Sequence, residues 1–316
     1  MKRRTITRSI GIVVAILLIA LTTGSLYMVK YALCPDHEGK DMKGSMIHIT
    51  NSYPGIQDWM DSITTNKVLK DTFITAPDGI RLHGFYLKAK EPTKRTAVIV
   101  HGYTDNAIRM FHIGHLYHQN LGYNILLPDL RNTGLSEGDA IQMGWLDRKD
   151  VMQWMEVANN IFGDSIQAVI HGISMGAATT MMVAGEETPE WVKCFVEDCG
   201  YTSVWDQFKK ELNEQFGLPA FPLLYYANMM CYLKYGWSFK EASAEAQVKK
   251  CHKPMFFIHG DQDDYVPTWM VYNLYEAKTG EKELWVTKDV KHARSYDAYP
   301  EEYTLRVKQF TEKYIN

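Results

Sequence analysis

One serine in this chain of 316 residues stands in a pattern that prepares a hydroxyl for nucleophilic attack. The segment Gly172–Gly176 (GISMG) follows the apolar run Gln167–Ile170 and precedes a helix-like stretch over Met175–Glu186. A Gly-x-Ser-x-Gly turn between strand and helix strains the serine backbone, and side chains at both glycine positions would strike the neighbouring strand and helix. The hydroxyl then projects at the positive end of the helix. The pattern predicts Ser174 as a nucleophile, against the alternative of an incidental serine in a glycine-rich turn.

A serine hydroxyl is a weak nucleophile that needs a base, and the base needs a supporting carboxylate. His292 lies in a loop after the last apolar run and is the candidate base, with a solvated loop histidine as the alternative. Candidate carboxylates follow the apolar run Met255–Ile258, in the segment 259–267 (HGDQDDYVP). They are Asp261, Asp263 and Asp264. The order serine, aspartate, histidine along the chain is the one found in strand-turn-helix hydrolase sites.

A tetrahedral intermediate also needs backbone donors for its oxyanion. The loop 101–104 (HGYT) follows the apolar run Thr96–Val100, and Gly102 allows a close approach of the backbone. The N–H groups of Tyr103 and Met175 can converge on one oxygen. We therefore predict these two amides as the oxyanion hole.

The elements that must position these residues alternate between short apolar runs and helix-like stretches. Eight runs are predicted as strands, over residues 71–75, 81–88, 96–100, 124–127, 167–170, 192–196, 255–258 and 283–287. Helices are predicted over residues 107–120, 145–161, 175–186, 268–278 and 299–314. This alternation predicts an α/β fold with a mostly parallel eight-stranded sheet and helices on both faces. In such sheets the functional loops lie beyond the carboxyl ends of the strands.

Residues 202–249 break this alternation, because they are helix-like, rich in aromatic residues and free of strand runs. A connection of this length is far longer than usual. We predict a helical lid inserted over the active edge of the sheet. Its aromatic side chains could line an acyl pocket or simply pack the lid on the core.

The motifs together resemble those of α/β-hydrolases, and more narrowly those of bacterial membrane-anchored or secreted lidded serine hydrolases near the serine aminopeptidase-like group. The resemblance covers about residues 70–316. It rests on the segments 101–104, 129–138 (DLRNTGLSEG), 172–176 and 259–267, together with His292. It implies the α/β-hydrolase fold, with Ser174 as nucleophile, His292 as base and Asp263 as supporting acid.

The resemblance selects Asp263 because the acid of that family stands three residues after the His-Gly pair and three before the valine. Asp261 and Asp264 are then ordinary turn carboxylates. Asp198 is the rival acid, because it ends the apolar run before it and some hydrolases place the acid there. Two positions depart from the family pattern: Asn132 replaces a usual glycine and Lys291 replaces the glycine before the histidine. Asparagine tolerates left-handed geometry, so the first turn can survive.

The N-terminus has the pattern of a membrane anchor. Residues 10–29 contain no charged residue and would span about 30 Å as a helix, about one bilayer core. Four basic residues precede the span, which favours a cytoplasmic N-terminus; they are Lys2, Arg3, Arg4 and Arg8. We predict residues 1–30 as a basic tip and single transmembrane anchor, 31–70 as an irregular spacer with one helix around Ile56–Ile63, and 71–316 as the hydrolase domain.

This assignment places the protein in the cell membrane, with an extracytoplasmic catalytic domain. The alternative is a signal peptide that is cleaved to release a secreted protein. Five of the 34 basic residues lie in residues 1–30, which hold no acid, so the remainder carries a net charge of −8. An acidic body of this kind argues against nucleic-acid binding, which needs a clustered positive surface.

The predicted activity is acyl-enzyme hydrolysis of carboxylic esters on a small-molecule or short peptide acyl substrate, with no metal or cofactor implied. A serine peptidase or amidase of the aminopeptidase-like type is the alternative; an acyltransferase or a non-catalytic binding module is less favoured. A lid carboxylate that binds a substrate amine would favour the peptidase, and the candidates are Glu211, Glu214, Glu241 and Glu245. His112, His115 and His118 lie at helical spacing and are predicted to be packing or surface residues rather than metal ligands.

Overall fold

The structure is a computed structural model that describes residues 2–36 and 38–316; the side chains of residues 1–8, 37 and 38 lie outside the described part. The side chains of the basic residues in the predicted cytoplasmic tip are therefore not described. The chain divides into two compact units. The sheet unit comprises residues 36–202 and 243–316, and the anchor unit comprises residues 1–35 and 203–242.

The sheet unit contains one sheet of eight strands, as the sequence predicts. The strands are β1 (Lys70–Thr75), β2 (Arg81–Leu87), β3 (Arg95–Val100), β4 (Asn124–Pro128), β5 (Gln167–Ile173), β6 (Val192–Asp198), β7 (Met255–Gly260) and β8 (Lys282–Thr287). Their order is β1-β2-β4-β3-β5-β6-β7-β8. Only the β1–β2 and β2–β4 pairs are antiparallel, so the predicted mostly parallel sheet is confirmed.

The register of the central strands brings their carboxyl ends to one edge of the sheet. Val100 of β3 pairs with Gly172 of β5, and Ile173 of β5 pairs with Asp198 of β6. Asp198 in turn pairs with Ile258 of β7. The loops that follow these strands therefore begin side by side, which is where the sequence places its candidate chemistry.

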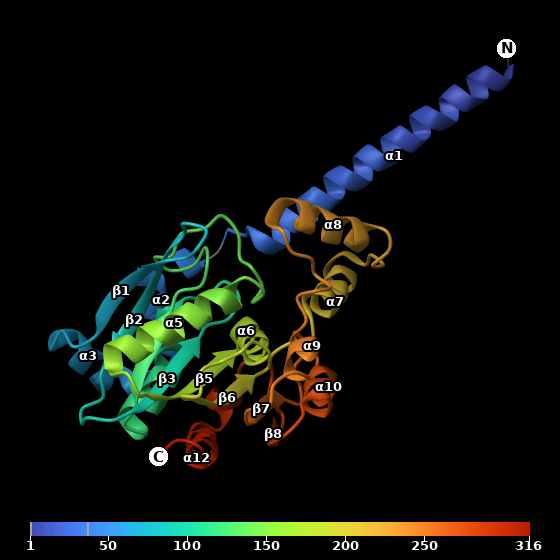
Figure 1. Cartoon of the computed structure of the whole chain (residues 1–316). Helices are drawn as coiled ribbons and strands as arrows, with labels where there is room; N and C mark the ends of the chain where they lie inside the picture. Colours follow the sequence, from blue (N-terminus) through green and yellow to red (C-terminus); the bar gives the residue numbers. More distant parts are fainter. Residues whose placement is uncertain (1, 37) are drawn as a thin grey trace. The chain divides into compact units, whose positions relative to one another are not determined.

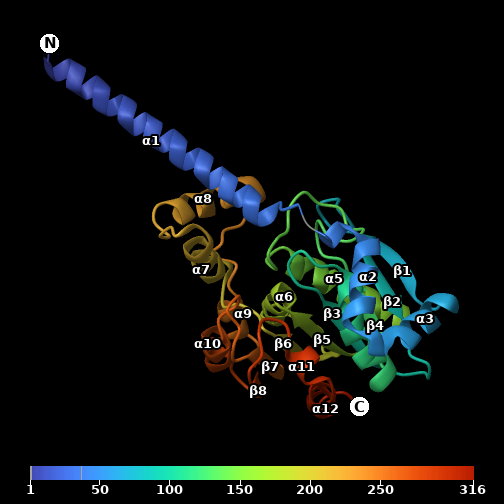
Figure 2. The same ribbon diagram turned by 180° about the vertical axis from the view of Figure 1, so that it is seen from behind.

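Helices cover both faces of this sheet (Figures 1 and 2). One face carries α5 (Asp147–Phe162), α6 (Met175–Ala184) and α10 (Trp269–Ala277). The other carries α3 (Gln57–Thr65), α4 (Phe111–His115) and α12 (Pro300–Thr311), with α11 (Ser295–Ala298) beside β7. Alternate strand residues such as Ala97 and Ile99 pack into the core that α3, α4 and α12 close. Strands that are buried on both faces explain the continuous apolar runs.

One part of the sheet unit differs from the prediction. The segment predicted to be an irregular spacer contains a further helix, α2 (Met42–Ser52), between the short turns η1 (Glu38–Lys40) and η2 (Pro54–Ile56). The side chain of Asp41 caps α2 by accepting from the Gly44 N–H at 2.9 Å. The helix predicted over residues 107–120 is confirmed: it is one continuous helical stretch, made of the 3₁₀ turn η3 (Ala107–Met110), α4 and the π-helical turn η4 (Leu116–Asn120).

The anchor unit is helical. Its helices are α1 (Lys2–Leu33), α7 (Val204–Phe216) and α8 (Leu223–Tyr235). Within α1, Ser9–Leu33 is long and apolar enough to cross a membrane, and 11% of its most apolar window is buried. The predicted lid segment thus forms helices, but its last helix, α9 (Ala244–Val248), belongs to the sheet unit.

Candidate active site

The turn between β5 and α6 has the geometry of a nucleophile elbow. Ser174 adopts φ 57° and ψ −120°, a strained conformation for a residue with a side chain. A Cβ on Gly172 would lie 2.0 Å from the carbonyl oxygen of Gly176, and one on Gly176 would lie 2.1 Å from that of Val100. The two glycines are therefore required by the close approach of α6 and β3. The turn is held by the Ser174 N–H, which donates to the Asp198 carbonyl at 2.8 Å.

The three residues of the predicted triad form one continuous chain of hydrogen bonds. The Ser174 hydroxyl lies 2.8 Å from Nε2 of His292, and Nδ1 of His292 lies 2.7 Å from Oδ2 of Asp263. Ser174 and Asp263 are buried, whereas the His292 side chain is 19% exposed. With its ring proton on Nδ1, His292 donates to the carboxylate and accepts from the hydroxyl. This is the arrangement in which an imidazole can remove a proton from a serine.

Asp263 is fixed by the loop that carries it. Its Oδ1 accepts from the N–H groups of Tyr265 and Val266 at 3.0 and 2.8 Å. Nε2 of His259 lies 3.3 Å from Oδ2 of Asp263 and donates to the Val266 carbonyl at 2.8 Å. Burial alone would raise the pKa of Asp263, but hydrogen bonds from His259 and His292 lower it to about 2. The carboxylate is therefore ionised at neutral pH.

His259 is a site residue to which sequence reasoning gave no role. It is fully buried beneath the loop and contacts both Asp263 and Val266. The His-Gly pair before the predicted acid was visible in the sequence, but only as a motif marker. Its contacts show that it closes the loop on which the carboxylate sits.

The loop that carries Tyr103 lies directly beside the elbow. A Cβ on Gly102 would lie 3.5 Å from the Cβ of Ser174. His101 anchors this loop, since its Nε2 accepts from the Leu130 N–H at 2.9 Å. Met175 is the first residue of α6, where backbone N–H groups lack partners within the helix. Tyr103 follows Gly102, which lies beside Ser174, and Met175 follows Ser174 directly, so both predicted oxyanion donors belong to segments that adjoin the serine.

The segment 129–138 contacts the loops around the site and holds its own turn in place. Asp129 is buried and accepts from the Ala107 N–H at 2.8 Å and the Leu135 N–H at 3.0 Å. Arg131 forms a two-pronged ion pair with Asp150, at 2.6 and 2.9 Å. Asn132, which replaces the usual glycine, adopts φ 61°, so its left-handed turn is retained. These contacts assign the segment to structure rather than to chemistry.

Asp198, the rival acid, contacts a different partner. Its Oδ2 accepts from the Tyr303 hydroxyl at 3.0 Å, and Tyr303 also contacts Nε2 of His171 at 3.0 Å. Burial raises the pKa of Asp198 from 3.8 to about 7. The residue that faces His292 is Asp263.

The buried carboxyl of Asp198 makes stability depend on pH. The folded state holds this proton up to about pH 7, while the unfolded chain releases it near 3.8, so stability falls as pH rises between these values. We expect Asp198→Asn to raise the free energy of unfolding by up to about 4 kcal/mol above pH 7, with the gain vanishing near pH 4. Denaturant unfolding between pH 4 and pH 7 measures the free energy of unfolding of both chains, with Asp264→Asn as the control for loss of a carboxylate. If the free energies of the variant and the wild type differed by the same amount at every pH, the raised pKa of Asp198 would be contradicted.

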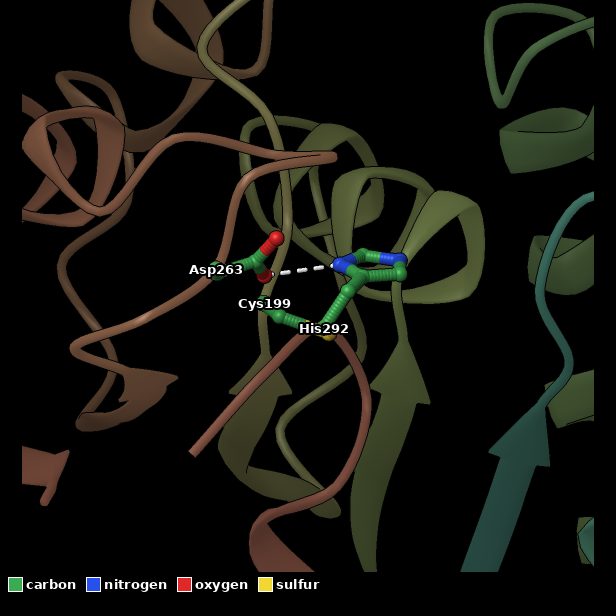
Figure 3. A group of neighbouring side chains, drawn as sticks. All are labelled: Cys199, Asp263 and His292. Atoms are coloured by element: carbon green, nitrogen blue, oxygen red, sulfur yellow. Dashed lines mark hydrogen bonds and ion pairs between the residues drawn. The ribbon is translucent and has the colours of Figure 1, made fainter. Parts of the chain in front are cut away.

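Cys199 directly follows the last residue of β6 and lies beside Asp263 and His292 (Figure 3). Its thiol and the side chains of Asp263 and His292 offer ligand atoms that all lie within 4.8 Å of one another, a grouping able to hold a metal ion. Burial raises the pKa of the Cys199 thiol, which keeps it protonated. Asp263 and His292 are already joined to each other in Figure 3, and His292 also contacts Ser174. The grouping therefore has the contacts of a proton relay.

The three histidines at helical spacing pack against aromatic residues. His112 stacks on Tyr53 with ring centroids 4.4 Å apart, and burial lowers its pKa to about 4. His118 accepts from the indole N–H of Trp59 at 3.0 Å. His115 lies edge to face with the same indole, at 5.5 Å. These contacts agree with the prediction of packing residues.

Comparison with known proteins matches residues 109–316, more than half of the chain, to the prolyl oligopeptidase family. The chain belongs to that family. The uncharacterized protein YqkD of Bacillus subtilis is 32% identical over 232 residues, which cover 73% of this chain and 75% of YqkD. The alpha/beta hydrolase domain-containing protein WAV2 of Arabidopsis thaliana is 24% identical over 237 residues, covering 72% of this chain and 70% of WAV2.

Solved structures of an esterase and of a peptidase share the fold. The esterase Pf2001 of Pyrococcus furiosus has a TM-score of 0.64 at 24% identity, covering 78% of this chain and 93% of the esterase. The acylaminoacyl peptidase of Pyrococcus horikoshii has a TM-score of 0.58 at 18% identity, covering 80% of this chain and 42% of the peptidase. The predicted α/β-hydrolase fold and the likeness to serine peptidase-like hydrolases are confirmed. This member of the prolyl oligopeptidase family is a serine hydrolase.

Proposed function

We propose that the protein hydrolyses carboxylic esters through an acyl-enzyme intermediate on Ser174. The observation that carries this proposal is the unbroken chain from the Ser174 hydroxyl to Nε2 of His292 and from Nδ1 to Asp263, at 2.8 and 2.7 Å. A strained elbow that presents the nucleophile at a helix N-terminus supports the same conclusion.

The proposed reaction has two stages, acylation of Ser174 and then hydrolysis of the acyl-serine. Ser174 Oγ attacks the substrate carbonyl carbon while its proton moves to Nε2 of His292, and Asp263 stabilises the imidazolium through Nδ1. The tetrahedral intermediate collapses as His292 returns the proton to the leaving alcohol, which leaves an acyl-serine. Water then attacks the acyl carbon, gives its proton to His292 and releases the acid as Ser174 recovers its own proton.

The developing oxyanion requires preorganised donors. The N–H groups of Tyr103 and Met175 are our candidates, because Gly102 lies beside Ser174 and Met175 begins α6. Donors of this kind stabilise charge that exists only in the transition state.

A serine peptidase or amidase is the second candidate, and membership in the prolyl oligopeptidase family favours it. The contacts of the candidate glutamates favour the ester. Each is already engaged: Glu211 and Glu214 contact Lys210 at 2.9 and 2.6 Å, Glu245 contacts Lys249 at 2.7 Å, and Glu241 accepts from Ser238 at 3.2 Å. Three of these carboxylates already face a lysine, which offsets their charge and weakens their attraction for a substrate amine.

A fluorophosphonate probe tests the proposal directly, because it forms a stable adduct only with an activated serine. We expect the full chain in detergent to be labelled to completion, with one adduct per molecule by intact mass. A heat-denatured sample is the control for nonspecific reaction. A folded chain that takes up no label would overturn the proposal and favour a non-catalytic binding module.

A matched substrate panel separates ester from amide hydrolysis. We expect kcat/KM for a short-chain acyl ester to exceed that for the amide of the same acyl group by at least about 10³-fold. An ester-specific enzyme lacks the contacts that protonate and orient an amine leaving group. Aminoacyl amides with a free amine and with a blocked amine are measured beside the esters, so that any dependence on the substrate amine is seen. Faster cleavage of the free aminoacyl amides than of the esters would favour the peptidase.

We further propose that α1 anchors the protein in the cell membrane with its N-terminus cytoplasmic, and that α7 and α8 form the lid. The uncharged span of residues 10–29 and the four basic residues before it support the orientation. The alternative remains a cleaved signal peptide.

A further inference from the structure

The C-terminal half of α1 packs against the lid helix α8 within the anchor unit. The hydroxyl of Ser25 donates to the Leu223 carbonyl at 3.4 Å, and a Cβ on Gly24 would lie 3.4 Å from the side chain of Leu223. Val29 and Leu33 follow on the same side of α1, since positions four apart share a helix face, and both are buried. Small residues at the crossing let the two backbones approach closely.

The contact continues to the end of α1. The hydroxyl of Tyr31 donates to the side-chain oxygen of Gln215 at 3.0 Å, and its ring meets Phe216 edge to face at 5.6 Å. Cys34 lies 3.3 Å from the hydroxyl of Tyr235. The anchor and the lid are thus one folded body, not two segments joined through a spacer. A cleaved leader would not be expected to form part of the packing of a lid.

The position of this contact along α1 fixes the level of α8. The uncharged span ends at Val29, and Ser25 lies about 6 Å before that end at about 1.5 Å per residue. When residues 10–29 fill the bilayer core, α8 lies at the level of its outer boundary.

The exposed side of α8 carries an apolar stripe, of which Tyr225 also meets Trp205 of α7 edge to face and has Lys240 over its ring. Tyr225, Met229, Tyr232 and Leu233 stand at helical spacing and are 46%, 44%, 56% and 69% exposed. Phe221, just before the helix, is 71% exposed. Lys234 is the single charged residue of α8. A helix this apolar is ordinarily buried or set against lipid, and tyrosine and phenylalanine suit the membrane interface.

We propose that this stripe, residues 221, 225, 229, 232 and 233, docks on the lipid interface of the bilayer that α1 crosses. Continuity with the anchor selects lipid over a soluble partner: α8 is held against α1 at the depth where acyl chains meet headgroups. An apolar face buried in that boundary binds in proportion to its area. The lid is therefore a membrane-seated element.

A bilayer-confined photoprobe tests this docking without any enzymatic readout. The full chain is reconstituted in phosphatidylcholine–phosphatidylglycerol vesicles with an apolar carbene precursor, and glutathione in the aqueous phase scavenges escaped probe. Mass spectrometry then maps the adducts. The controls are three residues of similar exposure on the sheet unit, Leu305, Tyr272 and Trp269, at 52%, 50% and 49%.

We expect the span of residues 10–29 and the α8 stripe to be labelled several-fold above these controls. The double variant Met229→Gln/Leu233→Gln is expected to bring α8 labelling down to the control level while the span stays labelled. A labelled span with α8 at the control level in the wild-type chain would overturn the docking. An unlabelled span would overturn the anchor and the docking together. Neither outcome depends on whether the protein is an esterase.

Discussion

The variant Ser174→Ala is expected to take up no fluorophosphonate and to lose kcat/KM for esters by about 10⁴-fold or more. Alanine removes the only atom that attacks the substrate, so neither the acyl-enzyme nor the probe adduct can form. The backbone hydrogen bonds of the elbow, from Ser174 N–H to Asp198 and from Ala178 N–H to the Ser174 carbonyl, do not involve the hydroxyl. The fold is therefore retained, and thermal unfolding should show a midpoint close to that of the wild type.

The matched control is Ser165→Ala, which removes the hydroxyl of an exposed serine. It should be labelled and turn over esters as the wild type does. If the alanine variant at position 174 still carried the probe on a serine, the nucleophile would be a different residue, and the elbow would be a structural turn.

The buried strands and the nucleophile elbow could be predicted from the sequence, because constraints between residues close in the sequence fix them. Strands buried on both faces must be apolar along their whole length, so runs such as Thr96–Val100 and Met255–Ile258 were unambiguous. The elbow was equally clear, because contacts near 2 Å from a Cβ at position 172 or 176 exclude every residue but glycine. Each of these constraints acts within a few residues of the motif itself.

Features set by distant contacts escaped prediction. The sequence of α2 holds glycine, serine and β-branched residues, which are weak helix formers, and the helix depends on its Asp41 cap and on Asn106, which donates to Ser45 at 2.8 Å. The packing of α1 on α8 joins residues about 200 positions apart, such as Ser25 and Leu223, and no periodicity could reveal it. His259 had no visible role because its partners depend on how its loop folds back.

The supporting acid of the triad likewise depends on contacts that the sequence pattern does not show. Asp198 ends a buried strand and Asp263 follows one, so their places after a strand do not separate them, and only the resemblance to the family selects Asp263. Their surroundings do: Asp263 receives two backbone N–H groups and two imidazoles, while Asp198 sits in a fully buried pocket with one tyrosine hydroxyl on Oδ2. The first environment stabilises a charge and the second disfavours it, so their pKa values move in opposite directions, to about 2 and about 7.

Replacing Asp263 by asparagine is therefore expected to lower kcat by about 10⁴-fold with little change in KM. The N–H groups of Tyr265 and Val266 both point at Oδ1, so the asparagine carbonyl must occupy that position and its NH₂ must face His292. An NH₂ cannot accept from Nδ1–H, so the ring moves its proton to Nε2. In that tautomer Nε2 has no lone pair for the Ser174 proton, and the base is lost.

Asp198→Asn is the decisive comparison, since Tyr303 can donate to an amide oxygen as it does to the carboxylate. We expect this variant to retain kcat within about tenfold, because its side chain lies outside the chain of bonds from Ser174 to Asp263. Steady-state kinetics on one short ester would measure both variants, with Asp264→Asn as the surface control. A loss at position 198 with activity kept at position 263 would move the acid to the end of β6, and the contact between His292 and Asp263 would then be structural.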